Sequence, residues 1–125
     1  MTVQNYSDFA DLAHVYLEDS FVLDITENAD SVSFSIEAVL TRQHPYYHTA
    51  TPGEQYCYVD ADLVIDGATE IRWIERINRA YTDASGETDL GNIDSMVYNN
   101  DHYEIAGDWG QVHIYTTHTP HLTLK

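Results

Sequence analysis

Apolar residues recur at a helical spacing near the start of the chain. Between Ser7 and Asp19 they lie three or four residues apart, at Phe9, Leu12, Ala13, Tyr16 and Leu17. This spacing places them on one face of an α-helix. Ser7 can cap such a helix, and the acidic residues of its first turn suit the helix dipole. We therefore expect one amphipathic N-terminal helix.

From residue 21 onward, apolar and polar residues alternate, which is the pattern of strands with one buried face. Two alternating runs, 21–26 and 32–40, flank turn residues at 28–30 and predict a first hairpin. We expect one face of this hairpin to be buried.

A second hairpin is expected from the runs 57–65 and 69–73. A three-residue loop at 66–68 puts Leu63 opposite Ile71, which keeps the apolar side chains of both strands on one face. A two-residue loop would mix the two faces, so we favour the longer loop.

Two short turns organise the C-terminal third, at Asn100-Asp101 and at Asp108-Trp109. They define three antiparallel strands that share one apolar face, made of Met96, Tyr98, Tyr103, Ile105, Val112 and Ile114. The opposite face sets Glu104 beside His113. A last short strand is expected at 122–124. Because two independent turns agree on one face, this register is the firmest part of the interpretation.

These elements predict an α+β fold in a single domain spanning residues 1–125. The N-terminal helix is expected to pack on a curved antiparallel sheet of about six to eight strands built from hairpins. Its apolar stripe should cover the face that carries Phe34, Ile36 and Trp73. The pattern leaves the strand order and the oligomeric state open.

Acidic residues dominate the charge, since 21 Asp and Glu against 5 Lys and Arg give a formal net charge of −16. Binding to nucleic acids or to anionic membranes needs a basic surface, so we expect neither. The chain has no apolar run long enough to span a bilayer and no signal-peptide pattern, which favours a cytoplasmic protein. The single cysteine, Cys57, fits a reducing compartment, and its alternation with apolar neighbours predicts a core position.

Tyrosines beside acidic residues form the best candidate binding surface. Tyrosine offers a large contact area with a polar tip, and carboxylates attract cations. The surface that we expect to bind a partner includes Tyr46, Tyr47, Tyr58, Asp60 and Asp62. The alternative is that Tyr46 and Tyr47 only cover the open end of the sheet.

Glu104 and His113 are the candidate catalytic pair, because a carboxylate beside an imidazole can orient a general base. No nucleophile, phosphate-binding loop or other catalytic motif accompanies them. An ordinary polar pair on a solvated sheet face is the alternative, and we expect no cofactor.

Two groups of residues contain side chains of the kinds that bind metal ions. The acidic loop offers alternate oxygen ligands for calcium at Asp83, Ser85, Glu87, Asp89 and Asp94, but its spacing departs from that of a calcium-binding loop. For zinc, the candidate ligands are His113, His118 and His121 with Asp108, and no pattern arranges them tetrahedrally. We therefore expect neither ion.

Four stretches resemble small uncharacterised bacterial proteins of unknown function. They are Gly91–Ser95, Tyr103–Ile114, Pro52–Tyr58 and Ile71–Ile74. In its short length, its acidity and its expected helix-then-sheet order, the chain is also similar to immunity proteins of bacterial toxin systems. This second resemblance implies a protein that neutralises a toxin, and neither resemblance supplies a catalytic motif.

The sequence thus favours a non-enzymatic acidic protein that binds a basic protein partner, as an inhibitor or immunity protein does. One alternative is a small-ligand or metal-dependent enzyme that uses Glu104 and His113. The other is that the acidity reflects adaptation of the host and says nothing about a partner.

Overall fold

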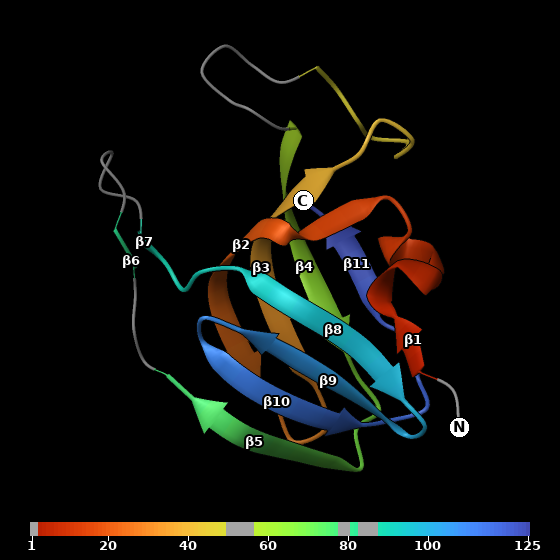
Figure 1. Ribbon diagram of the computed structural model, residues 1–125, viewed down its shortest axis with the longest axis vertical. Helices are drawn as coiled ribbons and strands as arrows, with labels where there is room; N and C mark the ends of the chain where they lie inside the picture. The colour runs from red at the N-terminus through yellow and green to blue at the C-terminus, as the bar shows by residue number, and fades with distance from the viewer. Residues whose placement is uncertain (1–2, 50–56, 78–80, 83–87) are drawn as a thin grey trace.

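Two antiparallel sheets face each other in the computed structural model (Figure 1). The structure describes residues 3–49, 57–77, 81–82 and 88–125. One sheet has five strands in the order β1-β8-β9-β10-β5, and the other has four in the order β11-β4-β3-β2. A two-stranded ribbon, β6-β7, completes the described strands.

The five-stranded sheet gathers strands from both halves of the chain. Its members are β1 (Val3–Asn5), β8 (Ile93–Asn99), β9 (His102–Gly107), β10 (Gly110–Tyr115) and β5 (Glu70–Arg76). The four-stranded sheet contains β11 (His121–Leu124), β4 (Cys57–Ile65), β3 (Val32–Leu40) and β2 (Val15–Glu27). The ribbon pairs β6 (Tyr81–Thr82) with β7 (Thr88–Asp89).

The expected N-terminal helix is absent, and the predicted α+β class is wrong. The segment forms two 3-10 turns, η1 (Tyr6–Asp8) and η2 (Ala10–Leu12), and then enters the long strand β2 at Val15. A helix of about 13 residues is marginal unless packing supports it, whereas β3 offers β2 a partner on both sides of residues 17–20. Pairing with β3 therefore stabilises this segment as a strand despite its helical periodicity.

A bulge interrupts the pairing of β2 with β3. Tyr16 pairs with Val39 and Phe21 pairs with Glu37, so residues 17–20 lie opposite a single residue of β3. The buried Ser20 hydroxyl bridges this gap, since it accepts the Val39 N–H at 2.9 Å and donates to the Tyr16 carbonyl at 2.8 Å. The helical spacing has another origin, since Phe9, Leu12 and Ala13 lie in the 3-10 region before β2 and only Tyr16 and Leu17 of the stripe belong to the strand.

Of the two predicted hairpins, one forms and the other does not. The first hairpin is confirmed, because β2 and β3 pair around a turn that the Asn28 N–H closes on the Ser31 carbonyl at 2.8 Å. The second hairpin is wrong, because β4 pairs with β3 and β11 while β5 pairs with β10. Residues 66–69 therefore carry the chain from one sheet to the other.

The predicted register of the C-terminal strands is confirmed. Tyr98 lies opposite Tyr103, and Ile105 lies opposite both Met96 and Val112. Each of the two turns contains the two residues expected of it, and Asn100 adopts the positive φ of 65° that such a turn requires. A short last strand, β11, also forms as expected.

The core lies between the two sheets, and both contribute to it. Phe34 and Ile36 of β3 are fully buried, and so is Ile105 of β9. Phe34 packs on Trp109, from the turn between β9 and β10, with ring centroids 5.2 Å apart. Trp73, which we had expected on the same sheet as Phe34, belongs to β5 in the opposite sheet. Cys57 is a free buried thiol in this core, as predicted.

The sheets are also tied together at their edges. The Val22 N–H of β2 donates to the Gly91 carbonyl at 2.8 Å, and Phe21 bridges to Asn92 just before β8. On β5, the Trp73 indole N–H donates to the Glu27 carboxylate of β2 at 2.8 Å. In the described part of the chain, no helix is long and apolar enough to cross a membrane.

Candidate functional site

The outer face of the four-stranded sheet holds three of the five residues expected to bind a partner. On β4 the inward positions alternate with outward ones, and Tyr58, Asp60 and Asp62 all point outward. Asp60 is exposed, and Asp62 forms an ion pair with Lys125, whose Nζ lies 3.2 Å from the Asp62 Oδ1. Two carboxylates and a tyrosine thus lie in one row on a rigid strand.

Neighbouring strands extend this row into a surface. The Phe21 ring of β2 lies against the Tyr58 ring with centroids 6.0 Å apart, and Glu37 of β3 lies opposite Asp60. Tyr16, opposite Val39 at the same end, is 44% exposed. We call this surface the acidic aromatic face, and it comprises Tyr16, Phe21, Glu37, Tyr58, Asp60 and Asp62. Sequence reasoning missed Tyr16 and Phe21, because it had assigned Tyr16 to the helix.

The other two expected residues lie elsewhere. Tyr46 is 69% exposed in the connection between β3 and β4, where it lines a hollow with Leu122 and Leu124 of β11. Tyr47 is partly buried against the core. The structure therefore divides the expected surface between the acidic aromatic face and a hollow beside β11.

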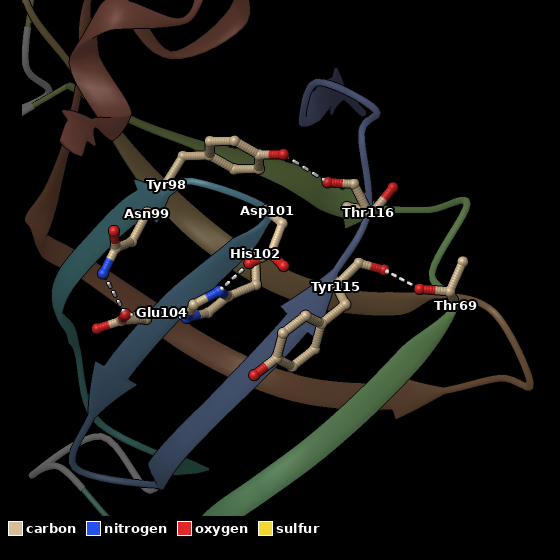
Figure 2. A network of polar contacts seen from close by, with 8 residues as sticks. All are labelled: Thr69, Tyr98, Asn99, Asp101, His102, Glu104, Tyr115 and Thr116. Atoms are coloured by element: carbon tan, nitrogen blue, oxygen red, sulfur yellow. Dashed lines mark hydrogen bonds and ion pairs between the residues drawn. The ribbon is translucent and has the colours of Figure 1, made fainter. Parts of the chain in front are cut away.

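A polar cluster occupies the outer face of the five-stranded sheet, and Glu104 and His113 belong to it. These two residues lie directly opposite each other on β9 and β10, as the sequence predicted. Between Glu104 and Asp101 lies His102, which the sequence analysis missed (Figure 2). Its Nε2 is 3.0 Å from the Glu104 carboxylate, and its Nδ1 is 2.8 Å from that of Asp101.

Stacked rings hold His102 in place. Its imidazole stacks on Tyr115, with 4.6 Å between the ring centroids (Figure 2). The centroid of the His113 ring lies 5.1 Å from that of His102. An ionised carboxylate only accepts hydrogen bonds, so His102 satisfies both carboxylates at once only when both of its nitrogens carry a proton. The alternation of residues 102 and 104 along one strand is the sequence signal that would have found it.

The environment of Glu104 keeps this carboxyl group ionised. Asn99 donates to its Oε2 at 3.1 Å (Figure 2). This hydrogen bond, the one from His102 and the electrostatic influence of His113 and His102 hold the pKa of Glu104 below its ordinary value. A carboxylate with a lowered pKa is a weaker base. The cluster therefore resembles a fixed polar network more than a proton-accepting catalytic site.

Two of the five calcium candidates, Asp89 and Asp94, lie in the part of the chain that the structure describes, and they do not form a metal site there. Asp89 accepts the Gly91 N–H at 2.8 Å, and burial, with the nearby Asp108, raises the pKa of Asp94. A raised pKa marks a carboxylate that nothing positive compensates. The other three candidates, Asp83, Ser85 and Glu87, lie outside the described residues.

The zinc candidates separate into different places. His118 and His121 approach Asp66 instead, at 2.8 and 4.0 Å, while His113 lies in the cluster around His102. Asp108 accepts the Asn92 N–H at 3.1 Å. Within the described ranges, no group of three or more His, Cys, Asp or Glu side chains is placed to hold a metal ion.

Comparison with family models, with curated proteins and with solved structures gave no match for this chain. The resemblance to immunity proteins therefore stays a prediction.

Proposed function

We propose that this chain is a non-enzymatic binding protein that takes up a basic segment of a protein partner on its acidic aromatic face. One observation carries the proposal: on the outer face of the four-stranded sheet, the Phe21–Tyr58 ring pair lies in the same surface as the Asp60 and Asp62 carboxylates. A long Lys or Arg side chain can lay its stem on such rings and bring its charge to the carboxylates.

The charge of the whole chain supports the same partner. A formal net charge of −16 attracts cationic proteins and raises their rate of encounter at low ionic strength. The aromatic rings add apolar contact area that remains effective when salt screens the charges. An inhibitor that must meet a basic toxin quickly needs both properties. The buried free thiol of Cys57 supports action in a reducing cytoplasm.

The enzyme alternative has less support. It uses Glu104 and His113, which do lie opposite each other, but the Glu104 carboxylate is engaged by Asn99 and His102, while the His113 Nε2 contacts Gln111. We therefore propose no reaction at the His102 cluster.

The test compares two double variants that lose the same charge. Asp60→Asn with Asp62→Asn removes the carboxylates of the proposed face. Asp8→Asn with Asp30→Asn removes two exposed carboxylates of η1 and of the β2–β3 turn, and serves as the matched control. Peptides selected on the wild-type protein from a random display library are then measured for affinity and association rate at several NaCl concentrations.

We expect the selected peptides to be basic. Their affinity should fall about tenfold for the first variant, since two charge pairs are lost, and should change less than about twofold for the control. Their association should slow as salt rises, because screening removes the steering. Equal losses in both variants would attribute binding to net charge alone and favour the host-adaptation alternative. A selection that yields no basic peptides would contradict the proposal.

A further inference from the structure

A cation of the chain itself already lies on the acidic aromatic face. Lys125, the single lysine of the sequence, follows β11 at the edge of the four-stranded sheet (Figure 1). Its backbone N–H donates to the Asp60 carbonyl at 2.9 Å, which continues the pairing of β11 with β4. Because Thr123 lies opposite the outward Asp62 and side chains alternate along a strand, the Lys125 side chain also lies on the outer side.

The ammonium group of Lys125 reaches two acceptors on the neighbouring strands. Its Nζ lies 3.2 Å from the Asp62 Oδ1 of β4 and donates to the Ser35 Oγ of β3 at 3.4 Å. Ser35 lies directly opposite Asp62 in the pairing of these two strands. The Lys125 side chain therefore extends from the edge of the sheet across the outer surface of β4. A basic side chain of the partner has to enter the same space to reach Asp62.

This ion pair is exposed and therefore easily broken. The side chains of Lys125 and Asp62 are 51% and 37% exposed, and water and salt weaken the attraction between such groups. While the pair is formed, however, the Asp62 carboxylate is less available to a second cation. The apparent affinity for a ligand falls in proportion to the fraction of protein in which its binding group is available.

We propose that Lys125 is an internal competitor on the acidic aromatic face, and that a basic side chain of the partner binds to Asp62 by displacing it. This inference rests on the proposed function, of which it specifies the regulation. It also predicts the sign of an effect: removing a residue that contacts the partner weakens binding, whereas removing an internal competitor strengthens it.

The test measures the affinity of the selected basic peptides for the wild type, Lys125→Met, Asp62→Asn and the double variant at about 150 mM NaCl. Methionine keeps a long side chain without its charge. We expect Lys125→Met to raise the affinity about threefold, because Asp62 is then available in every molecule. In the Asp62→Asn background, the same substitution should change the affinity less than about 1.5-fold, because the carboxylate for which Lys125 competes is absent.

Arg72→Met is the control for the loss of one positive charge. Arg72 is 59% exposed and forms an ion pair with Glu70 at 2.7 Å, but it belongs to β5 in the other sheet. We expect this variant to change the affinity less than about 1.5-fold, because screening weakens distant charges. Equal gains in Lys125→Met and Arg72→Met, or equal gains from Lys125→Met with and without Asp62, would attribute the effect to net charge and overturn the internal competitor.

The displacement itself can be followed by NMR. Because Lys125 is the only lysine, selective isotope labelling of lysine gives a single side-chain signal. The Asp62→Asn variant shows where this signal lies when the ammonium has lost the Asp62 carboxylate. Binding of an unlabelled peptide should move the wild-type signal toward that position.

The outcomes separate this inference from the function on which it rests. A Lys125 signal that stays at its wild-type position while a basic peptide binds would overturn the displacement and keep the proposed function. Lower affinity in Lys125→Met would do the same, since Lys125 would then contribute to binding. A selection that yields no basic peptides would contradict the proposed function, and the internal competitor with it.

Discussion

One of the contacts that join the two sheets comes from a residue in a turn. Trp109 follows Asp108 in the tight connection between β9 and β10, yet it is only 1% exposed. Its ring packs on Phe34 of the opposite sheet and lies edge-on to Trp73, 6.0 Å away. A single aromatic side chain therefore couples strands from both sheets, and the packing partners of Phe34 should determine much of the stability.

Replacing Phe34 by Ala should lower the free energy of unfolding by about 3–5 kcal/mol, because it leaves a cavity beside Trp109 that the core fills only in part. Urea denaturation monitored by tryptophan fluorescence measures the loss. Ile74→Ala is the control, since this side chain is 50% exposed and its removal should change stability by less than about 0.5 kcal/mol. A loss below about 1 kcal/mol for Phe34→Ala would contradict the described core.

Glu104 should stabilise the fold in a pH-dependent way. Because its pKa is lowered in the folded protein, the stabilisation is complete above the ordinary carboxyl pKa of 4.5 and is lost as the pH falls through the lower folded value. Glu104→Gln should therefore be less stable than the wild type at about pH 5, and the difference should vanish toward about pH 2. Chemical denaturation across this range measures it.

Glu75→Gln is the matched control for this measurement, because Glu75 is an exposed carboxylate of β5 outside the network around His102. If the free energies of unfolding of Glu104→Gln and the wild type differ by the same amount at every pH in this range, the network around His102 does not hold the Glu104 carboxylate as described.

At the scale of elements, the alternation of apolar and polar residues predicted strand pairing correctly where the paired strands follow each other in the chain. The turns at residues 100–101 and 108–109 leave little choice of register, so the pairing of β8, β9 and β10 could be derived from alternation alone. The same reasoning failed for β4 and β5, which alternate equally well but lie in different sheets. Alternation shows which side chains are buried, but it does not show against which strand.

Two glycines in connections should respond differently to substitution. Gly110 has φ of 127°, and an added Cβ would lie 2.2 Å from the Glu75 carbonyl oxygen, a backbone atom that β5 holds in place. Gly67 has φ of 68°, and its Cβ would meet the ring of His118, an exposed side chain that can rotate away. Gly110→Ala should cost about 3 kcal/mol or more, and Gly67→Ala about 1–2 kcal/mol.

Thermal unfolding of the two variants checks this order. Equal losses would show that the positive φ of both glycines, and not the close approach of Glu75, sets the cost. A smaller loss for Gly110→Ala would mean that β10 does not approach β5 as closely as described.

At the scale of the whole molecule, the two outer faces differ in chemistry. Carboxylates and aromatic rings cover the outside of the four-stranded sheet, whereas Arg72, His102 and His113 lie among the acidic residues on the outside of the five-stranded sheet. The total charge nevertheless remains strongly negative. Its mutual repulsion opposes the compact state, and it directs cationic partners to the molecule.

Moderate NaCl should therefore raise the free energy of unfolding at neutral pH, because screening relieves repulsion among the carboxylates. Denaturation in urea, which is uncharged, measures this increment without adding ions. The same titration at about pH 4 is the control, since many carboxylates are then protonated and the increment should shrink. A stability that ignores salt at neutral pH would show that local ion pairs balance the charge.

The sequence by itself determined the β character of most of the chain, the β2–β3 hairpin, the C-terminal register and the outward row of Tyr58, Asp60 and Asp62. Each depends on side chains that alternate along one strand or on a turn between adjacent strands. Only the tertiary structure decided that β2 begins at Val15 in place of a helix, that β4 and β5 separate, and that Tyr16 and Phe21 join the acidic aromatic face. The reason is that these outcomes depend on pairing with strands distant in sequence, and the free energy of that pairing exceeds the local preference of any short segment.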